Sequence, residues 1–318
     1  MKLKQLPEDF FVREIPAFVE GEGTNSIFLL RKKNYTTEKA VQTIADSFNI
    51  KRNRIGYAGL KDKYAITEQF ISIKMFSPKK IDSFSLKDID LEFVGFSKNP
   101  ISIGLLKGNF FEITIRDLGD NAHVQTSMLL KNFFDEQRFS NNNAEIGRAI
   151  VKKNFKKAVE ILLENTGDYE SVVKAFLDRS PNNYVGAISC VPKKILILFI
   201  HAYQSYIFNE TISKINFSEN KKIPLVGFGT DYEDEFVKNI VQDLLLKEGV
   251  SERDFLIPQI PDISSAGGER NIYVLPENLE IGLFEDDDLN KNKKKLSVSF
   301  SLPKGAYATN VVKQIILE

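Results

Sequence analysis

The sequence contains one cysteine, two histidines and no tryptophan, and these scarcities exclude several kinds of site. The lone Cys190 cannot form a disulfide within the chain, which suits a reducing compartment, so we expect a cytoplasmic protein. One cysteine and two histidines cannot build a zinc site of the usual Cys/His kind. The Walker loop and the glycine pattern of dinucleotide-binding proteins are absent too. We therefore expect no metal and no cofactor, and any catalysis to depend on carboxylates and lysines.

Long apolar runs are also missing. The longest, at 195–200, falls far short of the roughly 20 residues that cross a bilayer. The charged N-terminus lacks the apolar stretch of a signal peptide. We therefore expect no membrane partner.

The 318 residues carry no net charge, with 43 basic and 43 acidic side chains, and the length predicts about two domains. The charges are unevenly distributed, because residues 31–63 hold nine basic side chains against three acidic ones. Such a segment is typical of a surface that meets phosphates, although a solvated helix-and-loop face would look the same. The charge alone does not decide between these interpretations.

Short β-rich pieces at 10–12 and 27–30 predict strands. Side-chain alternation predicts further strands at 71–75, 109–116 and 296–300. A helix is expected after Thr36 or Thr37, because Ala40, Val41 and Ile44 share one face. From residue 121 the pattern turns helical, with helices predicted over 124–134, 146–163, 171–177, 193–215 and 236–248. Near the C-terminus we expect an exposed charged loop at 284–295 and a last strand at 308–317. This order predicts an α+β fold in which a mostly helical insertion interrupts a catalytic domain.

The most informative stretch is Gly59-Leu60-Lys61-Asp62-Lys63-Tyr64-Ala65-Ile66-Thr67-Glu68-Gln69. By itself, an aspartate between two lysines is typical of a turn with solvated charges. The stretch, however, resembles the signature of the tRNA pseudouridine synthase D (TruD) family, Gly-x-Lys-Asp-[Lys/Arg]-x-Ala-x-Thr-x-Gln. Four more blocks resemble that family in the same order along the chain, at 7–10, 107–111, 137–139 and 302–309.

The resemblance implies a pseudouridine synthase-type catalytic domain with a mixed, mainly antiparallel sheet, made of residues 1–134 and 282–318. Residues 135–281 would form the family's insertion domain. The implied activity is that of an isomerase that converts uridine to pseudouridine in tRNA, usually at position 13. By the same resemblance, Asp62 matches the nucleophile and Lys4 a cation that pairs with it. Phe10, Asn109 and Tyr307 match positions that line the uridine pocket, and Phe111 matches an aromatic residue near the target base.

Pseudouridine formation breaks the N1–C1′ bond of uridine and rejoins the uracil through C5. The base must first leave the RNA stack, which costs a few kcal/mol, and stacking on aromatic rings offsets this by about 1–3 kcal/mol per base. Phe10, Phe111 and Tyr307 are suitable rings, although a core role for Phe111 is equally plausible. A carboxylate can act as a nucleophile, and a neighbouring cation would keep Asp62 ionised. The rearrangement is redox-neutral and so needs no cofactor.

We expect tRNA as the partner, with other structured RNA as a further candidate and no obligate protein partner. Phosphate contacts are predicted for basic side chains of the first third of the chain, namely Arg31, Lys32, Lys33, Lys51, Arg52, Arg54, Lys61 and Lys63. The alternative function is a non-catalytic RNA-binding protein, a tRNA chaperone of the same fold, against which the intact Asp62 argues. A two-carboxylate glycoside hydrolase is a third class, but Asp62 has no evident partner acid nearby in the sequence.

Overall fold

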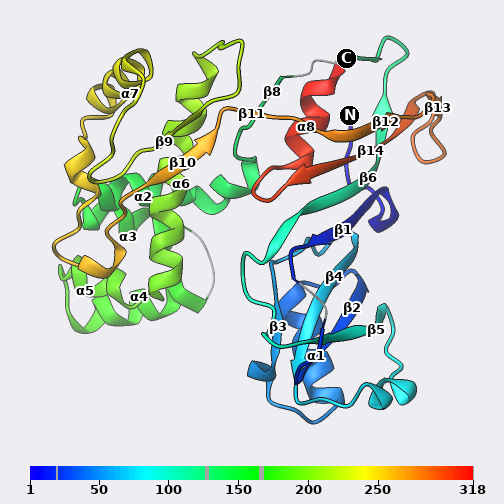
Figure 1. Ribbon diagram of the computed structural model, residues 1–318. Coiled ribbons are helices and arrows are strands. Elements are labelled where there is room, and N and C mark those ends of the chain that lie inside the picture. The colour runs from blue at the N-terminus through cyan, green and yellow to red at the C-terminus, as the bar shows by residue number, and fades with distance from the viewer. Residues whose placement is uncertain (19–20, 126–128, 165–167, 318) are drawn as a thin grey trace. The chain divides into compact units, whose positions relative to one another are not determined.

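The computed structural model describes residues 1–18, 21–125, 129–164 and 168–317, and the chain forms two compact units (Figure 1). The first unit comprises Met1–Met128 and Leu275–Glu318, and the second comprises Leu129–Val274. The sequence had placed the insertion at 135–281. Within the described ranges, no helix has both the length and the apolar character needed to cross a membrane.

The first unit is built on one large mixed sheet whose main strands follow the order β12-β14-β6-β1-β4-β2-β5. β1 and β4 run parallel, whereas the other strand pairs of this sheet in the described residues are antiparallel. The α+β prediction with a mixed, mainly antiparallel sheet is therefore confirmed. The strands are β1 (Phe10–Pro16), β2 (Asn25–Lys33), β3 (Ile55–Tyr57), β4 (Ile66–Lys74), β5 (Ile89–Ser97), β6 (Leu106–Leu118), β12 (Glu277–Ile281), β13 (Glu285–Asp286) and β14 (Lys294–Pro303).

The two faces of this sheet differ because side chains alternate along each strand. Helix α1 (Thr37–Ser47) packs its apolar stripe on one face, against Phe28 and Leu30 of β2 and Ile71 of β4 (Figure 1). We call this the front face and the opposite one the back face. Lys32 lies two residues beyond Leu30 and pairs with Thr67 of β4, so its side chain also belongs to the front face.

The C-terminal segment is a helix, α8 (Ala308–Ile315), followed by the short strand β15 (Ile316–Leu317). The prediction of a strand over 308–317 is therefore wrong. Ala308, Val311, Val312 and Ile315 are buried, and their spacing of three and four residues is that of one helix face. Burial of this face outweighs the strand preference of its β-branched residues.

The predicted helix at 124–134 is also wrong for the residues that the structure describes, while 126–128 lie outside them. His123–Val124 form strand β7, which pairs with β15, and Leu130–Lys131 form β8, which pairs with β11 (Tyr273–Val274). The backbone hydrogen bonds of this segment are made with strands that are distant in the sequence. A short apolar pattern does not reveal such pairing.

The second unit is mostly helical and has its own apolar core, built around the long helix α6. The predicted helix at 146–163 is two helices, because the chain turns at Lys153, where φ is +59°, and the side chain of Asn154 caps the second helix. The elements are α2 (Asn143–Val151), α3 (Phe155–Leu163), α4 (Asp168–Arg179), α5 (Tyr184–Ser189), α6 (Lys193–Ser213), α7 (Glu235–Glu248) and the hairpin β9 (Lys222–Leu225) with β10 (Gly268–Asn271).

Candidate active site

The loop between β3 and β4 carries the signature segment, and buried polar side chains hold it in place. The Thr37 hydroxyl accepts a hydrogen bond from the backbone N–H of Lys61 (2.9 Å) and donates one to the amide oxygen of Gln69 (2.9 Å). The Gln69 amide nitrogen in turn donates to the carbonyl of Gly59 (3.1 Å). Thr37 and Gln69 are fully buried. The start of α1 and the middle of β4 therefore fix both ends of the short stretch before Asp62.

Lys32 holds the loop from the sheet. Its side-chain nitrogen donates to the backbone carbonyl oxygens of Asp62 (2.8 Å) and Tyr35 (2.6 Å), and only 1% of the residue is exposed. Burial lowers the pKa of Lys32 to about 8, although the nearby charge of Asp62 acts in the opposite direction. The prediction that Lys32 contacts RNA phosphates is wrong, because its ammonium group points into the protein and is already hydrogen-bonded.

The Asp62 carboxylate pairs with the ammonium group of Lys4 across 3.2 Å. One third of the Asp62 side chain and one quarter of the Lys4 side chain remain exposed, so solvent or a ligand can reach the pair. The Lys4 nitrogen also lies 4.2 Å from the centre of the Phe10 ring. The side chains of Lys4, Phe10 and Asp62 thus lie together on the front face, although Asp62 is far from the other two in the sequence.

A second ionic group lies deeper on the same face. The Lys61 nitrogen lies 2.9 Å from a carboxylate oxygen of Glu14 and donates to the amide oxygen of Asn109 at 2.8 Å. The Lys61 and Glu14 side chains are 6% and 1% exposed. The prediction that Lys61 binds phosphate is therefore wrong, since this lysine neutralises a buried carboxylate. By donating to the Asn109 oxygen, it also sets which end of that amide faces outward.

The predicted aromatic residues occupy two kinds of place. Phe10 and Phe111 are buried, and their rings meet edge to face with centres 6.1 Å apart. Phe111 also contacts Phe300 on β14, at 5.8 Å between centres. These rings support the site from the core rather than present an open face. Tyr307 is half-buried and precedes α8, five residues after Leu302, which pairs with Asn109.

Two largely apolar side chains that the sequence did not single out lie close to Asp62 in the chain. Leu60 is 70% exposed and Tyr64 is 62% exposed, and both stand in the loop that carries Asp62. The Lys63 nitrogen lies 5.8 Å from the centre of the Tyr64 ring. Both fall at unspecified positions of the signature, so the motif itself gave no signal for them.

The remaining basic residues are spread over different surfaces. Arg31 and Lys33 alternate with Lys32 along β2, so they point to the back face, away from Asp62. There Arg31 pairs with Glu68 and Lys33 with Glu8. Both side chains remain partly exposed, so their contacts with RNA phosphates stay a prediction, and such contacts would be made on the back face.

The basic residues after α1 are held differently. Arg52 pairs with Glu38 of α1 (2.8 Å), whereas Arg54 donates to the backbone carbonyls of Lys74 and Met75. Lys51 and Lys63 are exposed. Their part in RNA binding stays a prediction.

Sequence reasoning missed the buried polar residues Glu14 and Thr37, and the role of Gln69 as an anchor. A signal existed for Glu14, because it alternates with the apolar Phe10 and Val12 along β1 and so falls on their buried face. A charged residue at such a position needs a partner inside the protein. Thr37 was noticed only as a helix cap, and the cap is in fact Thr36.

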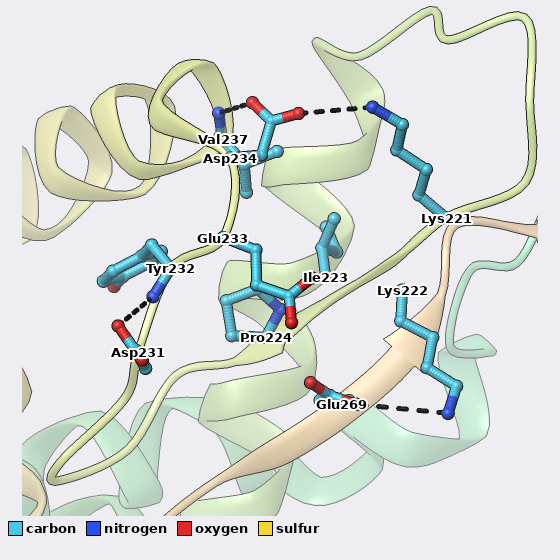
Figure 2. Close-up of a pocket in the computed structure, with 10 residues that line it drawn as sticks. All are labelled: Lys221, Lys222, Ile223, Pro224, Asp231, Tyr232, Glu233, Asp234, Val237 and Glu269. Atoms are coloured by element: carbon cyan, nitrogen blue, oxygen red, sulfur yellow. Dashed lines mark hydrogen bonds and ion pairs between the residues drawn. The ribbon is translucent and has the colours of Figure 1, made fainter.

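A separate cavity of about 510 Å³ lies in the second unit, beside the start of α7 (Figure 2). Two ion pairs line it, as Figure 2 shows for Lys221 with Asp234 (3.5 Å) and Lys222 with Glu269 (4.0 Å). None of the predicted site residues lines it. Among the side chains that the structure describes, no group of three histidine, cysteine or acidic residues could hold a metal ion.

Comparison with known proteins points to one family. A family model described as tRNA pseudouridine synthase D (TruD) matches residues 1–175, 168–219 and 216–315. The chain is 31% identical to a probable tRNA pseudouridine synthase D 2 of Methanocaldococcus jannaschii, with 100% of this chain and 92% of that protein covered. It is 27% identical to the tRNA pseudouridine synthase D of Aquifex aeolicus, covering 99% of this chain and 98% of that one. A crystal structure of a putative tRNA pseudouridine synthase D from Methanosarcina mazei superposes with a TM-score of 0.77 at 26% identity, covering 99% and 93%.

Proposed function

The chain belongs to the tRNA pseudouridine synthase D family, and we propose that it converts a uridine of tRNA to pseudouridine, at the family's usual position 13. In this proposal Asp62 is the nucleophile, and the target nucleotide leaves the RNA stack to reach it. One observation carries the proposal: a partly exposed Asp62 carboxylate is paired with Lys4 at 3.2 Å, on a loop whose backbone is hydrogen-bonded to Lys32 of the sheet.

The isomerisation of uridine requires a well-placed nucleophile and no other reagent. The N1–C1′ bond breaks and a C5–C1′ bond forms, while N1 gains a proton and C5 loses one, so no electrons are exchanged with another reagent. A carboxylate can form a covalent intermediate while the uracil turns. A nucleophile whose position is fixed before the substrate arrives lowers the entropic part of the barrier. Hydrogen bonds to the backbone of Asp62 and an ion pair to its side chain supply that fixation.

Side chains around Asp62 suit an extruded base. Asn109 presents the free end of its amide on the front face, because Lys61 occupies the other end, and an amide can pair with the edge of uracil. The exposed ring of Tyr64 offers a stacking surface. Phe10 and Phe111 support the site from beneath, with Phe10 in contact with Lys4.

A tRNA modification assay tests the proposal. Unmodified tRNA transcript is incubated with the wild-type protein, with Asp62→Ala and with the control Asp90→Ala, which alters an exposed aspartate on β5. Pseudouridine is then mapped by carbodiimide labelling and primer extension. We expect modification at position 13 by wild type and by the control, and none by Asp62→Ala even where it binds tRNA.

The same assay separates the enzyme from an RNA-binding protein without activity. If wild type binds tRNA and forms no pseudouridine, the catalytic proposal fails and the result supports the non-catalytic RNA-binding alternative. If Asp62→Ala retains activity, the enzyme uses a different nucleophile.

A further inference from the structure

Lys4 has a backbone conformation that needs support from its surroundings. Its φ of +57° lies in the left-handed region, which residues with a side chain rarely adopt. The residue nevertheless places its ammonium group 3.2 Å from Asp62. Contacts on either side of Lys4 must therefore hold the segment in this shape.

One anchor lies before Lys4 and the other after it. Before it, Lys2 and Arg116 of β6 exchange backbone hydrogen bonds of 2.7 and 2.9 Å. After it, the backbone N–H of Leu6 donates to a carboxylate oxygen of Asp9 at 2.8 Å. The left-handed turn at Lys4 is thus clamped between two fixed points only four residues apart.

A single buried ion pair joins these two anchors. The guanidinium Nε of Arg116 donates to the second oxygen of the Asp9 carboxylate at 2.8 Å. Both side chains are buried, at 7% and 2% exposure. Asp9 therefore holds Leu6 with one oxygen and Arg116 with the other, while the backbone of Arg116 holds Lys2.

Arg116 is itself fixed from the segment after β13. Its Nη1 donates to Asp287 (3.0 Å) and Asp288 (2.9 Å). Burial disfavours the charged guanidinium, but hydrogen bonds to Asp288, Asp9 and Asp287 outweigh this and raise the pKa of Arg116. The arginine therefore stays charged.

We infer that Asp9 and Arg116 are positioning residues: through the backbone of residues 2–6 they hold Lys4 against Asp62. This inference rests on the proposed function, because it assigns these residues to the geometry of the same nucleophile. Neither residue is expected to touch the substrate, since both are buried beneath the segment that they hold.

A double-mutant cycle between Asp9 and Lys4 tests the inference. In Asp9→Asn the side chain keeps one acceptor oxygen for two donors, so either Leu6 or Arg116 loses its partner. We expect Asp9→Asn to lower kcat for pseudouridine formation about tenfold or more, with tRNA KM changed less than threefold. Lys4→Met should lower kcat by at least as much. The double variant should be no slower than Lys4→Met within a factor of about two, because Asp9 acts only through Lys4.

Asp286→Asn is the matched control. Asp286 belongs to the same acidic run as Asp287 and Asp288, but its side chain is 92% exposed and pairs with Lys294 instead of Arg116. We expect this variant to keep wild-type kcat. Equal losses in Asp9→Asn and Asp286→Asn would mean that the loss of kcat reflects general stability, and the inference would be wrong. Fully multiplicative effects of Asp9→Asn and Lys4→Met would overturn it as well.

A second variant and the wild-type assay complete the test. If Asp9→Asn does not fold, Arg116→Lys keeps a positive charge among the aspartates and loses the Nε bond to Asp9, and the same cycle with Lys4→Met applies. The wild-type assay separates this inference from the proposed function. A wild type without activity on tRNA refutes the function, whereas an active wild type with independent Asp9 and Lys4 effects refutes the positioning role alone.

Discussion

The side-chain nitrogen of Lys32 lies 2.8 Å from the backbone carbonyl oxygen of Asp62, while the nitrogen of Lys4 lies 3.2 Å from its carboxylate. Two lysines from different segments therefore fix the same residue, one through its backbone and one through its side chain. Because a misplacement of about 1 Å at a reacting group can cost about a hundredfold in rate, both contacts should matter for activity.

Lys32→Met should reduce kcat about tenfold or more, since the carbonyls of Asp62 and Tyr35 lose their buried donor. Leaving a buried acceptor unpaired costs about 1–3 kcal/mol, but removal of a buried charge offsets part of this loss in the free energy of unfolding. Lys33→Met is the control, because that side chain points to the back face and pairs with Glu8. Single-turnover pseudouridine formation and urea unfolding measure both effects. Similar kcat values for the two variants would contradict the role of Lys32.

The stability of the protein should depend on pH through Lys32. Its pKa is lowered by burial to about 8, against 10.5 in the unfolded chain. Between these values the unfolded state binds the proton and the folded state does not, so the contribution of Lys32 to the free energy of unfolding rises as pH increases. Below pH 8 the ionised, buried amine costs stability in full.

Urea unfolding of wild type and Lys32→Met across this pH window checks the prediction. The difference between their free energies of unfolding should move in favour of wild type as pH rises from 8 towards 10.5. A difference that stays constant would show that Lys32 titrates normally.

Thr37→Val should loosen the loop that carries Asp62, because valine has the same shape but cannot bond Lys61 or Gln69. We expect the free energy of unfolding to fall by about 1–3 kcal/mol and kcat to fall as well. Thr43→Val is the control on the same helix: its hydroxyl only donates to the Lys39 carbonyl, and the change should stay within about 0.5 kcal/mol. Thermal unfolding and the tRNA assay report the two quantities.

Lys63 and Arg31 should differ in their effect on the salt dependence of tRNA binding. Lys63 is exposed beside Asp62, whereas Arg31 lies on the back face in an ion pair with Glu68. Loss of one phosphate contact reduces the slope of log K against log salt concentration by about 0.7–0.9. Lys63→Gln should show this reduction and Arg31→Gln should not. The opposite result would place the RNA on the back face.

Tyr64→Ala should weaken tRNA binding about tenfold, since base stacking contributes about 1–3 kcal/mol and the ring is 62% exposed beside Asp62. Tyr64→Phe keeps the ring and should bind like wild type. Tyr169→Ala removes a partly exposed ring of the second unit as a control. Binding titrations at one salt concentration distinguish these outcomes, and an unchanged Kd for Tyr64→Ala would exclude stacking there.

The local sequence was sufficient for the features that depend on neighbouring residues. The helix after Thr36 and the strand at 109–116 follow from apolar spacing, and the segment around Asp62 follows from its match to a family signature. Two of the errors share one cause. The segments at 124–134 and 308–317 carry apolar residues whose structure is decided by distant partners, namely strand pairing in one case and burial of a helix face in the other.

Arg31, Lys32 and Lys33 show what cannot be predicted from the sequence alone. Three adjacent basic residues look alike in a charge count, and the sequence alone establishes only that alternate residues of a strand point to opposite faces. Pairing of β2 with β4 and packing of α1 decide which face is which, so Lys32 is buried under Asp62 while its neighbours face away. The sequence determined that an acid and several cations are present. The tertiary structure decided which cations contact that acid, because burial and long-range contacts depend on position in space and not on position in the chain.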